Sequence, residues 1–412
     1  METKSIEAIK MQFLKAYREF GEKKLTCEQA ATLLGVGIST FYRMRQRYEE
    51  YNFDGRFDRR LGKASPHRAA DREVEFVTKL YEERYRDFSV KHFYEFAKQN
   101  PEFKRSYSWT KNKLVESGLV KKCNRGGKHR LRRERKPMAG MMLHQDGSKH
   151  RWIPALDYDL DLIVTMDDAT STITSCFLVK EEGVLSSFIG LYETIKKYGL
   201  FCSLYTDRGG HYFHTPEKGG KVDKHQLTQV GRALRQLNIK HIAAYSPQAR
   251  GRSERMFGTL QGRLPKELAL YNISTIEEAN KYIQEVYLSR HNKLFSTKQT
   301  GEQSAFTPWN SAISLEDILC FEEERTVQHD NTIRYKGFIL QIPKNEYRHH
   351  YIKAEVKVHE YFDSSVAIFY GPLCIGKYSA EGYLKEQKNK KQRKKEAEQA
   401  LGNYLRGVVY AV

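Results

Sequence analysis

The sequence predicts a multidomain chain: all-α units at the N-terminus, a central α/β core, and a small β-barrel-like domain near the C-terminus. Three observations predict this layout. The length of 412 residues allows about two to four domains. Helical periodicity dominates the first 122 residues, and strand and helix patterns alternate over residues 138–300. Short strands separated by turn residues then follow over residues 326–370.

The chain carries a strong positive charge. Its 70 Lys and Arg residues exceed its 51 Asp and Glu residues by 19. This excess predicts a polyanionic partner, which for a chain with helical units of the kind described below is double-stranded DNA. Hydrophobic residues make up 40% of the sequence and aromatic residues 12%, so the composition favours packed cores over a disordered tail.

Cellular context is indicated by what the sequence lacks. No run approaches 18 apolar residues and the first residues form no apolar signal segment, so we expect neither a membrane partner nor secretion. The six cysteines include no C-x-x-C pair, which favours free thiols in a reducing cytoplasm. The adjacent His349 and His350 are not expected to share a metal, because sequence neighbours face different ways on a regular element.

Residues 1–62 predict a helix-turn-helix DNA-binding domain. An amphipathic helix over residues 28–34 is followed by Gly35 in the turn, and Ser39 is expected to cap a second helix, residues 39–48. Three apolar residues are expected to fill the space between these helices: Val36, Ile38 and Phe41. The second helix would present four polar side chains to a major groove: Arg43, Arg45, Gln46 and Arg47. An ordinary helical hairpin with a solvated cationic face is the alternative.

Residues 63–122 predict a second helical unit, similar to a helix-turn-helix. Helices are expected over residues 71–86, 90–98 and 108–117. A basic linker, residues 123–137, follows this unit. Four of its cations are expected to lie along DNA phosphates: Lys128, Arg130, Arg132 and Arg133. A solvated flexible linker is the alternative, and the two interpretations are compatible.

Residues 138–300 predict a mixed sheet with helices on both faces. Apolar or strand-like runs end near residues 146, 168, 179, 207 and 245, and helical periods cover residues 183–198, 224–237, 250–270 and 275–290. Residues 301–380 are expected to form the small β-rich domain. Residues 381–412 would be a basic tail, since seven Lys and Arg residues fall within residues 385–395.

Three acids occupy notable positions in the predicted core. Asp146 ends the first strand, Asp207 ends the fourth, and Glu254 lies in the first turns of a long helix. Neighbouring strands can bring their terminal carboxylates together, and a packed helix can present a third. Such like charges repel unless cations lie between them, and clustered carboxylates suit Mg²⁺ or Mn²⁺.

Ordinary roles compete with this interpretation. A lone Asp before a turn, or a Glu in a first helical turn, is usually structural. Asp167 and Asp168 are also rivals for the first position of the set. We prefer Asp146 because it closes the first strand.

Three sequence blocks carry a resemblance to a known family: residues 144–148, 205–210 and 246–261. In the last block, Ser-Pro-Gln-Ala-x-Gly-x-x-Glu-Arg precedes Gly-Thr-Leu-Gln, a combination that is hard to match by chance. Over residues 141–290 the chain resembles DDE-type integrase-core transposases of bacterial insertion sequences.

The resemblance implies a ribonuclease H-like catalytic core with two divalent ions in each active site. Asp146, Asp207 and Glu254 would be its catalytic and metal-binding residues. It further implies a polynucleotidyl transferase that binds terminal inverted repeats, cleaves DNA and joins the ends to target DNA. Such a protein would act in the bacterial cytoplasm at the nucleoid, as a homodimer or higher oligomer on DNA.

The chain departs from the family pattern between its last two acids. Asp207 and Glu254 are 47 positions apart, wider than is common in the family. The surplus is expected at residues 211–224, as a surface insertion that spares the site. Three arginines around Glu254 are expected to hold DNA phosphates, with surface salt bridges as the alternative: Arg250, Arg252 and Arg255.

Two other functions remain as alternatives. A DNA-binding regulator built on an inactive core would lack one of the three acids, yet all three are present. A structure-specific nuclease of the same fold would not need two helix-turn-helix units and a basic linker. Site-specific binding to inverted repeats separates the nuclease from a transposase.

Overall fold

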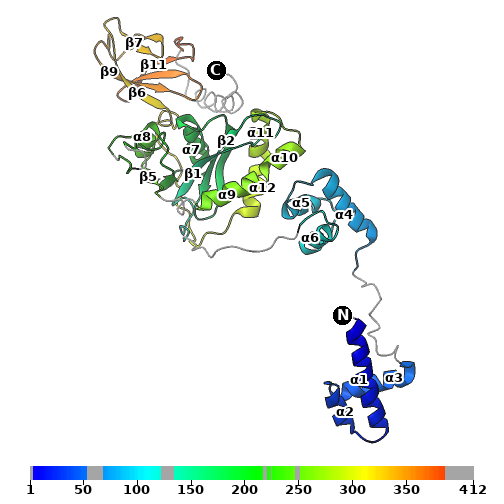
Figure 1. Ribbon diagram of the computed structural model, residues 1–412. Coiled ribbons are helices and arrows are strands. Elements are labelled where there is room, and N and C mark those ends of the chain that lie inside the picture. Colours follow the sequence, from blue (N-terminus) through cyan, green and yellow to red (C-terminus); the bar gives the residue numbers. More distant parts are fainter. Residues whose placement is uncertain are drawn as a thin grey trace. The chain divides into compact units, whose positions relative to one another are not determined.

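The computed structural model describes residues 3–52, 68–121, 134–216, 220–223, 225–245 and 251–385 (Figure 1). The chain divides into two units, Met1–Val77 and Thr78–Val412. Each unit is described by itself below. None of the described helices is long and apolar enough to cross a membrane.

Within its described residues, the first unit contains three complete helices and the start of a fourth, residues 71–77; the complete ones are α1 (Thr3–Gly21), α2 (Cys27–Leu33) and α3 (Ile38–Tyr51). Its small core contains Phe13, Ala16, Ala30, Ala31 and Phe41. Thr26 begins α2 with a capping box, in which its hydroxyl accepts from the Gln29 amide while the Gln29 side chain accepts from the Thr26 amide. Gly35 has a φ of +65° and makes the turn that follows, as the sequence predicted.

The start of α3 differs from the expectation in two ways. Gly37, not Ser39, is the N-cap, and it makes no side-chain cap. Ser39 lies inside the first turn, where its carbonyl accepts from Arg43 Nε at 3.2 Å. Ile38 is the first helical residue and is 45% exposed, so it does not fill the space between the helices. Phe41, one turn further on, is fully buried there.

The predicted second helical unit consists of α4 (Asp71–Arg84), α5 (Val90–Ala97) and α6 (Tyr107–Glu116), close to the expected ranges. Ser89 and Ser106 cap α5 and α6 by accepting main-chain hydrogen bonds. Ring contacts between α4 and α5, such as Tyr81 with Phe93 at 5.0 Å between centroids, form the interior of this unit.

A five-stranded mixed sheet forms the centre of the second unit (Figure 1), as the sequence predicted. Its strands are β1 (Leu143–His150), β2 (Leu160–Asp167), β3 (Ile173–Val179), β4 (Ser203–Thr206) and β5 (Lys240–Ala243). Their order is β3-β2-β1-β4-β5. The β3-β2-β1 pairs are antiparallel, and β1-β4 and β4-β5 are parallel.

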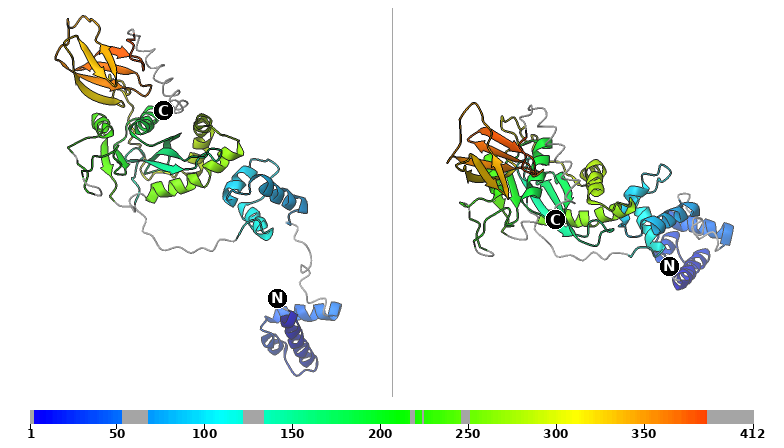
Figure 2. Two further views of the ribbon diagram at one scale, coloured as in Figure 1. Left: turned by 45° about the horizontal axis from the view of Figure 1, so that its top comes forward. Right: turned by 90° about the horizontal axis from the view of Figure 1, so that it is seen from above.

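Helices cover both faces of this sheet (Figure 2). One apolar core joins the sheet to α7 (Val184–Tyr198) and α8 (Gln229–Gln236). The other joins it to a longer helical run: α9 (Gly251–Gln261), α10 (Leu264–Leu270), α11 (Ile276–Tyr282), the π-helix η3 (Ile283–Tyr287) and α12 (Leu288–Phe295). Because strand side chains alternate, Ile163 enters the first core while Leu162 and Val164 enter the second.

The C-terminal part of the second unit is β-rich. Its strands are β6 (Phe321–Thr326), β7 (Thr332–Tyr335), β8 (Phe338–Gln341), β9 (Glu355–Glu360), β10 (Val366–Tyr370) and β11 (Leu373–Tyr378). They form a four-stranded sheet, β11-β10-β9-β6, and a separate β7-β8 hairpin around one shared core. The two sheets stay separate, so closure into a barrel is not confirmed. The basic tail from residue 386 lies outside the described residues.

Candidate active site

Asp146 in β1 and Asp207 directly after β4 lie at the same level of the sheet. Asp146 does not end its strand as predicted, because β1 stays paired with β2 as far as His150. In the parallel β1-β4 pair, His144 is the register partner of Tyr205. Each aspartate follows its partner by two positions, so both carboxylates leave the sheet at one place. Asp207 Oδ1 accepts a hydrogen bond from the Gly209 amide at 2.8 Å.

A buried phenol shows that these charges are close together. Tyr212 is 1% exposed, and its hydroxyl donates to Gln145 Oε1 at 3.2 Å. Burial raises the pKa of this phenol well above its ordinary value, and the charges of Glu182, Asp146 and Asp207 raise it further. The charges of three carboxylates therefore act on one hydroxyl. The sequence pattern did not single out Glu182.

The helix that carries Glu254 runs alongside β1. Near its end, Gln261 Nε2 donates to Ser148 Oγ at 3.1 Å. Near its start, Arg252 binds the Asp168 carboxylate, which also accepts from His144 Nε2. Glu254 lies between these contacts, about two helical turns before Gln261 and on the same helix face.

The third acid is not gathered with the aspartate pair. Glu254 is exposed in the first turn of α9. Among the residues that the structure describes, no group of three or more His, Cys, Asp and Glu side chains is arranged to hold a metal ion. The structure thus brings together Asp146 and Asp207 and leaves Glu254 beside them on α9.

The rival acids Asp167 and Asp168 are buried and make structural hydrogen bonds. Both are 1% exposed. Asp167 accepts from the amides of Gly140 and Thr170, each at 2.8 Å. Asp168 accepts from His144 Nε2 at 2.7 Å, from the Lys136 amide at 2.8 Å, and from Arg252.

The charge on Asp168 is stabilised strongly. Burial alone would raise the pKa of this carboxyl, but the hydrogen bonds from His144, Arg252 and the Lys136 amide outweigh burial and hold the pKa well below its usual range. Asp168 is therefore an anchored anion that joins β1, α9 and the segment before β1.

The predicted DNA-contacting arginines of the core fall into different environments. Arg252 has a side chain that is only 10% exposed, because it is bound to Asp168. This contact matches the salt-bridge alternative and leaves little of its surface for a phosphate. Arg255 is exposed, and its Nε donates to the Gly251 carbonyl at 3.1 Å. Arg250 lies outside the described residues.

The predicted recognition helix α3 shows a similar division. Arg43, Gln46 and Arg47 are exposed. Arg45 is partly buried: it pairs with Glu49 at 3.0 Å, and its guanidinium lies 5.4 Å from the centroid of the Phe20 ring. The linker cations Lys128, Arg130, Arg132 and Arg133 lie outside the described residues.

The helix α5 packs through buried polar contacts against the helices that follow α9 in the central α/β core. His92 Nε2 lies 2.7 Å from Glu267 Oε1 of α10, and both side chains are 1% exposed. Glu95 accepts from Arg263 at 2.6 Å. The ring of Phe96 lies 5.0 Å from the Arg290 guanidinium. Helix α5 is thus part of the core's packing, which local sequence patterns did not reveal.

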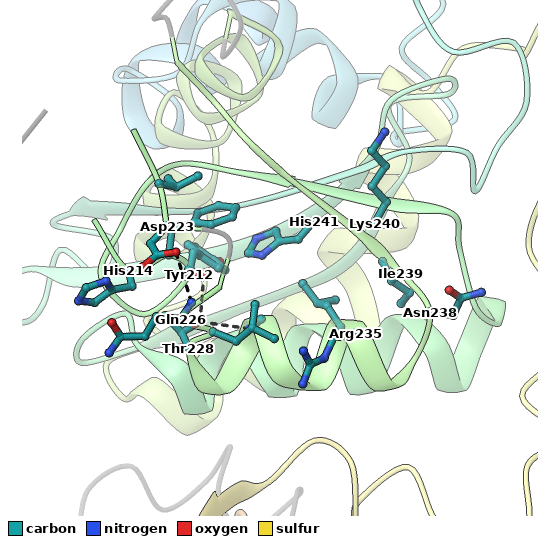
Figure 3. A pocket seen from close by; sticks show the side chains of 15 residues that line it. Tyr212, His214, Asp223, Gln226, Thr228, Arg235, Asn238, Ile239, Lys240 and His241 are labelled. Carbon is teal, nitrogen blue, oxygen red and sulfur yellow. Dashed lines mark hydrogen bonds between the residues drawn. The ribbon is translucent and has the colours of Figure 1, made fainter. Parts of the chain in front are cut away.

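The segment after Asp207 lies deeper than a surface insertion would. Tyr212 packs in the sheet core, and Phe213 stacks on His241 with 3.9 Å between ring centroids. This segment, α8 and β5 line a cavity of about 370 Å³ (Figure 3). In Figure 3, Tyr212 and His241 lie toward its middle and His214 at one side. None of the three predicted catalytic acids lines this cavity.

A helix-turn-helix followed by a mixed sheet with paired aspartates defines a class of DNA-processing proteins, and similarity to known proteins agrees. A homeodomain-like domain family matches residues 7–57. The putative transposase y4bF of Sinorhizobium fredii is 28% identical over 349 residues, which cover 84% of this chain and 75% of the relative. The transposase for insertion sequence IS1202 of Streptococcus pneumoniae is 31% identical over 205 residues, covering 50% of this chain and 43% of the relative. The chain is similar to these transposases, in agreement with the resemblance found in its sequence.

Solved structures show weaker similarity. The HTLV-2 integrase catalytic core in complex with magnesium is 18% identical, with a TM-score of 0.27, covering 36% of this chain and 89% of the integrase chain. The Mos1 transposase paired-end complex is 16% identical, with a TM-score of 0.26, covering 69% of this chain and 90% of the Mos1 chain.

Proposed function

We propose that the chain is a DDE-type transposase that binds the terminal inverted repeats of an insertion sequence and catalyses DNA cleavage and strand transfer. The main support for this proposal is that Asp146 and Asp207 lie at one level of the adjacent parallel strands β1 and β4. Transposase relatives and the net charge of +19 support DNA as the substrate. The strand order β3-β2-β1-β4-β5 supports a ribonuclease H-like core.

The proposed cofactor is a pair of Mg²⁺ or Mn²⁺ ions. Asp146 and Asp207 fit a divalent ion, because two hard oxygen donors with like charge lie close together beside a third carboxylate. Glu254 would complete the set from α9. When bound, the ions would activate the attacking hydroxyl and stabilise the leaving oxygen in an in-line displacement.

The protein's own residues would hold the reacting groups in place. β1 and β4 fix the main chain at Asp146 and Asp207, and the Gly209 amide orients one Asp207 oxygen. The anchored Asp168 holds α9 beside β1 through Arg252, so it positions the helix that carries Glu254. A 3′-hydroxyl released by hydrolysis would attack target DNA directly, so no nucleophilic Ser or Tyr is assigned.

Recognition of the transposon ends is assigned to the first unit. Arg43, Gln46 and Arg47 lie on the exposed face of α3, where they would reach a major groove. The active form would be at least a dimer on two DNA ends, because both ends must be joined to nearby target phosphates. Since α5 packs against α10 in this chain, the arm that reaches another subunit's DNA end would be the first unit rather than α4–α6.

A strand-transfer assay tests the proposal. The full chain is incubated with Mg²⁺, target DNA and a duplex that carries the inverted repeat flanking its gene. Wild-type protein should nick the repeat at its end and join the 3′-hydroxyl to target DNA. Binding to the repeat without joining would favour a regulator with an inactive core, and cleavage without preference for the repeat would favour a structure-specific nuclease.

Mixed subunits test the assembly. An Asp207→Asn subunit is combined with a subunit that carries Arg43→Ala and Arg47→Ala and binds ends poorly. Recovery of strand transfer in the mixture would demonstrate catalysis in trans. A fully active, DNA-bound monomer in light scattering would refute the proposed dimer.

A further inference from the structure

A fourth acid, Glu182, lies beside the two aspartates of the proposed active site. It directly precedes Gly183, the N-cap of α7, and its amide donates to Asp161 Oδ2 of β2 at 2.8 Å. This contact fixes the main chain from which the Glu182 side chain extends. The side chain is 25% exposed, so it is neither a core residue nor a freely solvated one.

Glu182 occupies the space that a side chain at position 147 would need. Gly147 directly follows Asp146 in β1, and a Cβ atom placed on it would lie 2.3 Å from Glu182 Oε2. Real Cβ atoms do not approach an oxygen so closely, so any larger residue would displace the carboxylate. The carboxylate therefore packs directly against the main chain next to Asp146.

The other oxygen of Glu182 faces the segment after β4. His211 Nε2 lies 3.5 Å from Glu182 Oε1, four positions after Asp207. Within the part of the chain that the structure describes, this nitrogen is shielded from solvent and makes no hydrogen bond, so the polar group that faces it is the Glu182 carboxylate. The His211 and Tyr212 rings are 4.0 Å apart, and the Glu182 charge acts on the Tyr212 phenol together with the charges of Asp146 and Asp207.

We propose that Glu182 is a positioning residue of the active site: through Gly147 and His211, it sets the separation between Asp146 and Asp207. This inference rests on the proposed transposase function. A third negative charge beside two aspartates is unfavourable for folding, so its presence is better explained by a functional role. Displacements of about 1 Å in a catalytic site can lower a rate by about 100-fold.

The first test compares Glu182→Ala and Glu182→Gln with a matched control, Glu181→Ala, at the exposed neighbouring acid. We expect Glu182→Ala to slow strand transfer by about 10- to 100-fold at saturating Mg²⁺. Glu182→Gln, which keeps the shape, should lose less. Binding to the repeat should match that of the control, and the melting temperature of the metal-free protein should not fall below that of the control. A rate for Glu182→Ala equal to that of Glu181→Ala would overturn the inference.

A second variant removes the same contact from the other side. Gly147→Ala should displace the Glu182 carboxylate and slow strand transfer to a similar extent. Because both substitutions break one contact, the double variant should be no slower than the slower single variant. Multiplicative losses would show that Gly147 and Glu182 act separately and would contradict the proposed link.

A metal-free measurement tests the positioning directly. In Glu182→Ala protein without Mg²⁺ or DNA, hydrogen exchange should accelerate at residues 207–211, including the Gly209 amide that binds Asp207, and stay unchanged in the β-rich C-terminal part. Unchanged exchange at residues 207–211 would refute the inference even if activity fell.

The Mg²⁺ concentration for half-maximal rate separates positioning from ligation. We expect it to stay unchanged in Glu182→Gln while the maximal rate falls. A raised Mg²⁺ requirement with a restored maximal rate would make Glu182 a metal ligand and overturn the positioning role. Lack of activity in wild-type protein would instead refute the proposed function, and the hydrogen-exchange test would still apply.

Discussion

Two pairs of aspartates lie in the same sheet and meet opposite surroundings. Asp167 and Asp168, at the end of β2, lie among main-chain amides, a histidine and a guanidinium. Asp146 in β1 and Asp207 after β4 lie beside each other, and a third carboxylate, Glu182, acts on the same phenol. The first pair meets hydrogen-bond donors, whereas the second pair, in which Asp207 also accepts from the Gly209 amide, additionally meets like charge.

The difference separates structural acids from functional ones. An acid among donors gains stability from its charge, whereas acids that face each other lose stability unless a cation joins them. We therefore expect the Asp167–Asp168 pair to matter most for folding and the Asp146–Asp207 pair to matter most for activity. Five predictions test this division, from the largest expected effect to the smallest.

The largest effect is expected at Asp146 and Asp207. Asp146→Asn and Asp207→Asn keep the side-chain shape and remove the charge that would hold the metal, so each should lower strand transfer by at least about 1,000-fold. Binding to the inverted repeat in a gel-shift assay should survive. If Asp146→Asn kept most activity while Asp167→Asn lost it, the assignment of the first acid would be wrong.

Glu254 tests whether α9 contributes the third acid. Glu254→Gln should also abolish cleavage and strand transfer while the protein stays folded, because the side chain is exposed in the first turn of α9. Glu285→Gln, at an exposed acid elsewhere in the core, is the control and should keep its activity. An active Glu254→Gln variant would leave the aspartate pair as a two-acid site.

Asp168 should show the reverse behaviour, in stability rather than in chemistry. Asp168→Asn leaves the Arg252 guanidinium without its anion, which should cost about 3 kcal/mol in the free energy of unfolding at pH 7. Urea unfolding measures this cost, and Asp146→Asn should cost less than about 1 kcal/mol.

The contribution of the Asp168–Arg252 ion pair to the free energy of unfolding should depend on pH, and the sign of this dependence follows from the pKa of Asp168. Hydrogen bonds depress the pKa of Asp168 in the folded state, so the unfolded chain binds a proton at this site more readily. The stability that Asp168 contributes is therefore present at neutral pH and is lost as the pH falls below about 4. The difference between wild type and Asp168→Asn should shrink with acid. A constant difference would contradict this account.

The smallest effects are expected in α3, where arginines divide in the same way. Arg43→Ala and Arg47→Ala should each weaken binding to the repeat by about 1–3 kcal/mol if they reach base edges, and mainly reduce salt dependence if they reach phosphates. Arg45→Ala should instead lower the melting temperature, because it removes the contacts with Glu49 and Phe20. Equal affinity of wild type for random DNA at every salt concentration would refute specific recognition.

Local patterns predicted much of this molecule. Residues 71–86 were expected to be helical and α4 covers Asp71–Arg84, because apolar spacing and first-turn acids depend only on nearby residues. The mixed sheet and the position of Asp207 at the end of β4 followed from the same kind of signal, whereas Asp146 does not end its strand, because β1 stays paired with β2 as far as His150. The start of α3 was predicted less well, since the Gly37 main chain begins the helix without a side-chain cap.

Tertiary structure decided what each charged residue does. Arg252 binds an acid 84 positions away, and His92 binds one 175 positions away, so no local window contains both partners. The same holds for Glu182, whose contacts with Gly147 of β1 and with His211 after β4 come from distant parts of the sequence. Composition and periodicity determined the elements and the basic character of the chain. The packing of distant segments decided which acids are held by hydrogen-bond donors and which lie beside like charge. The physical reason is that electrostatic interactions depend on separation in space and on burial rather than on distance in the sequence.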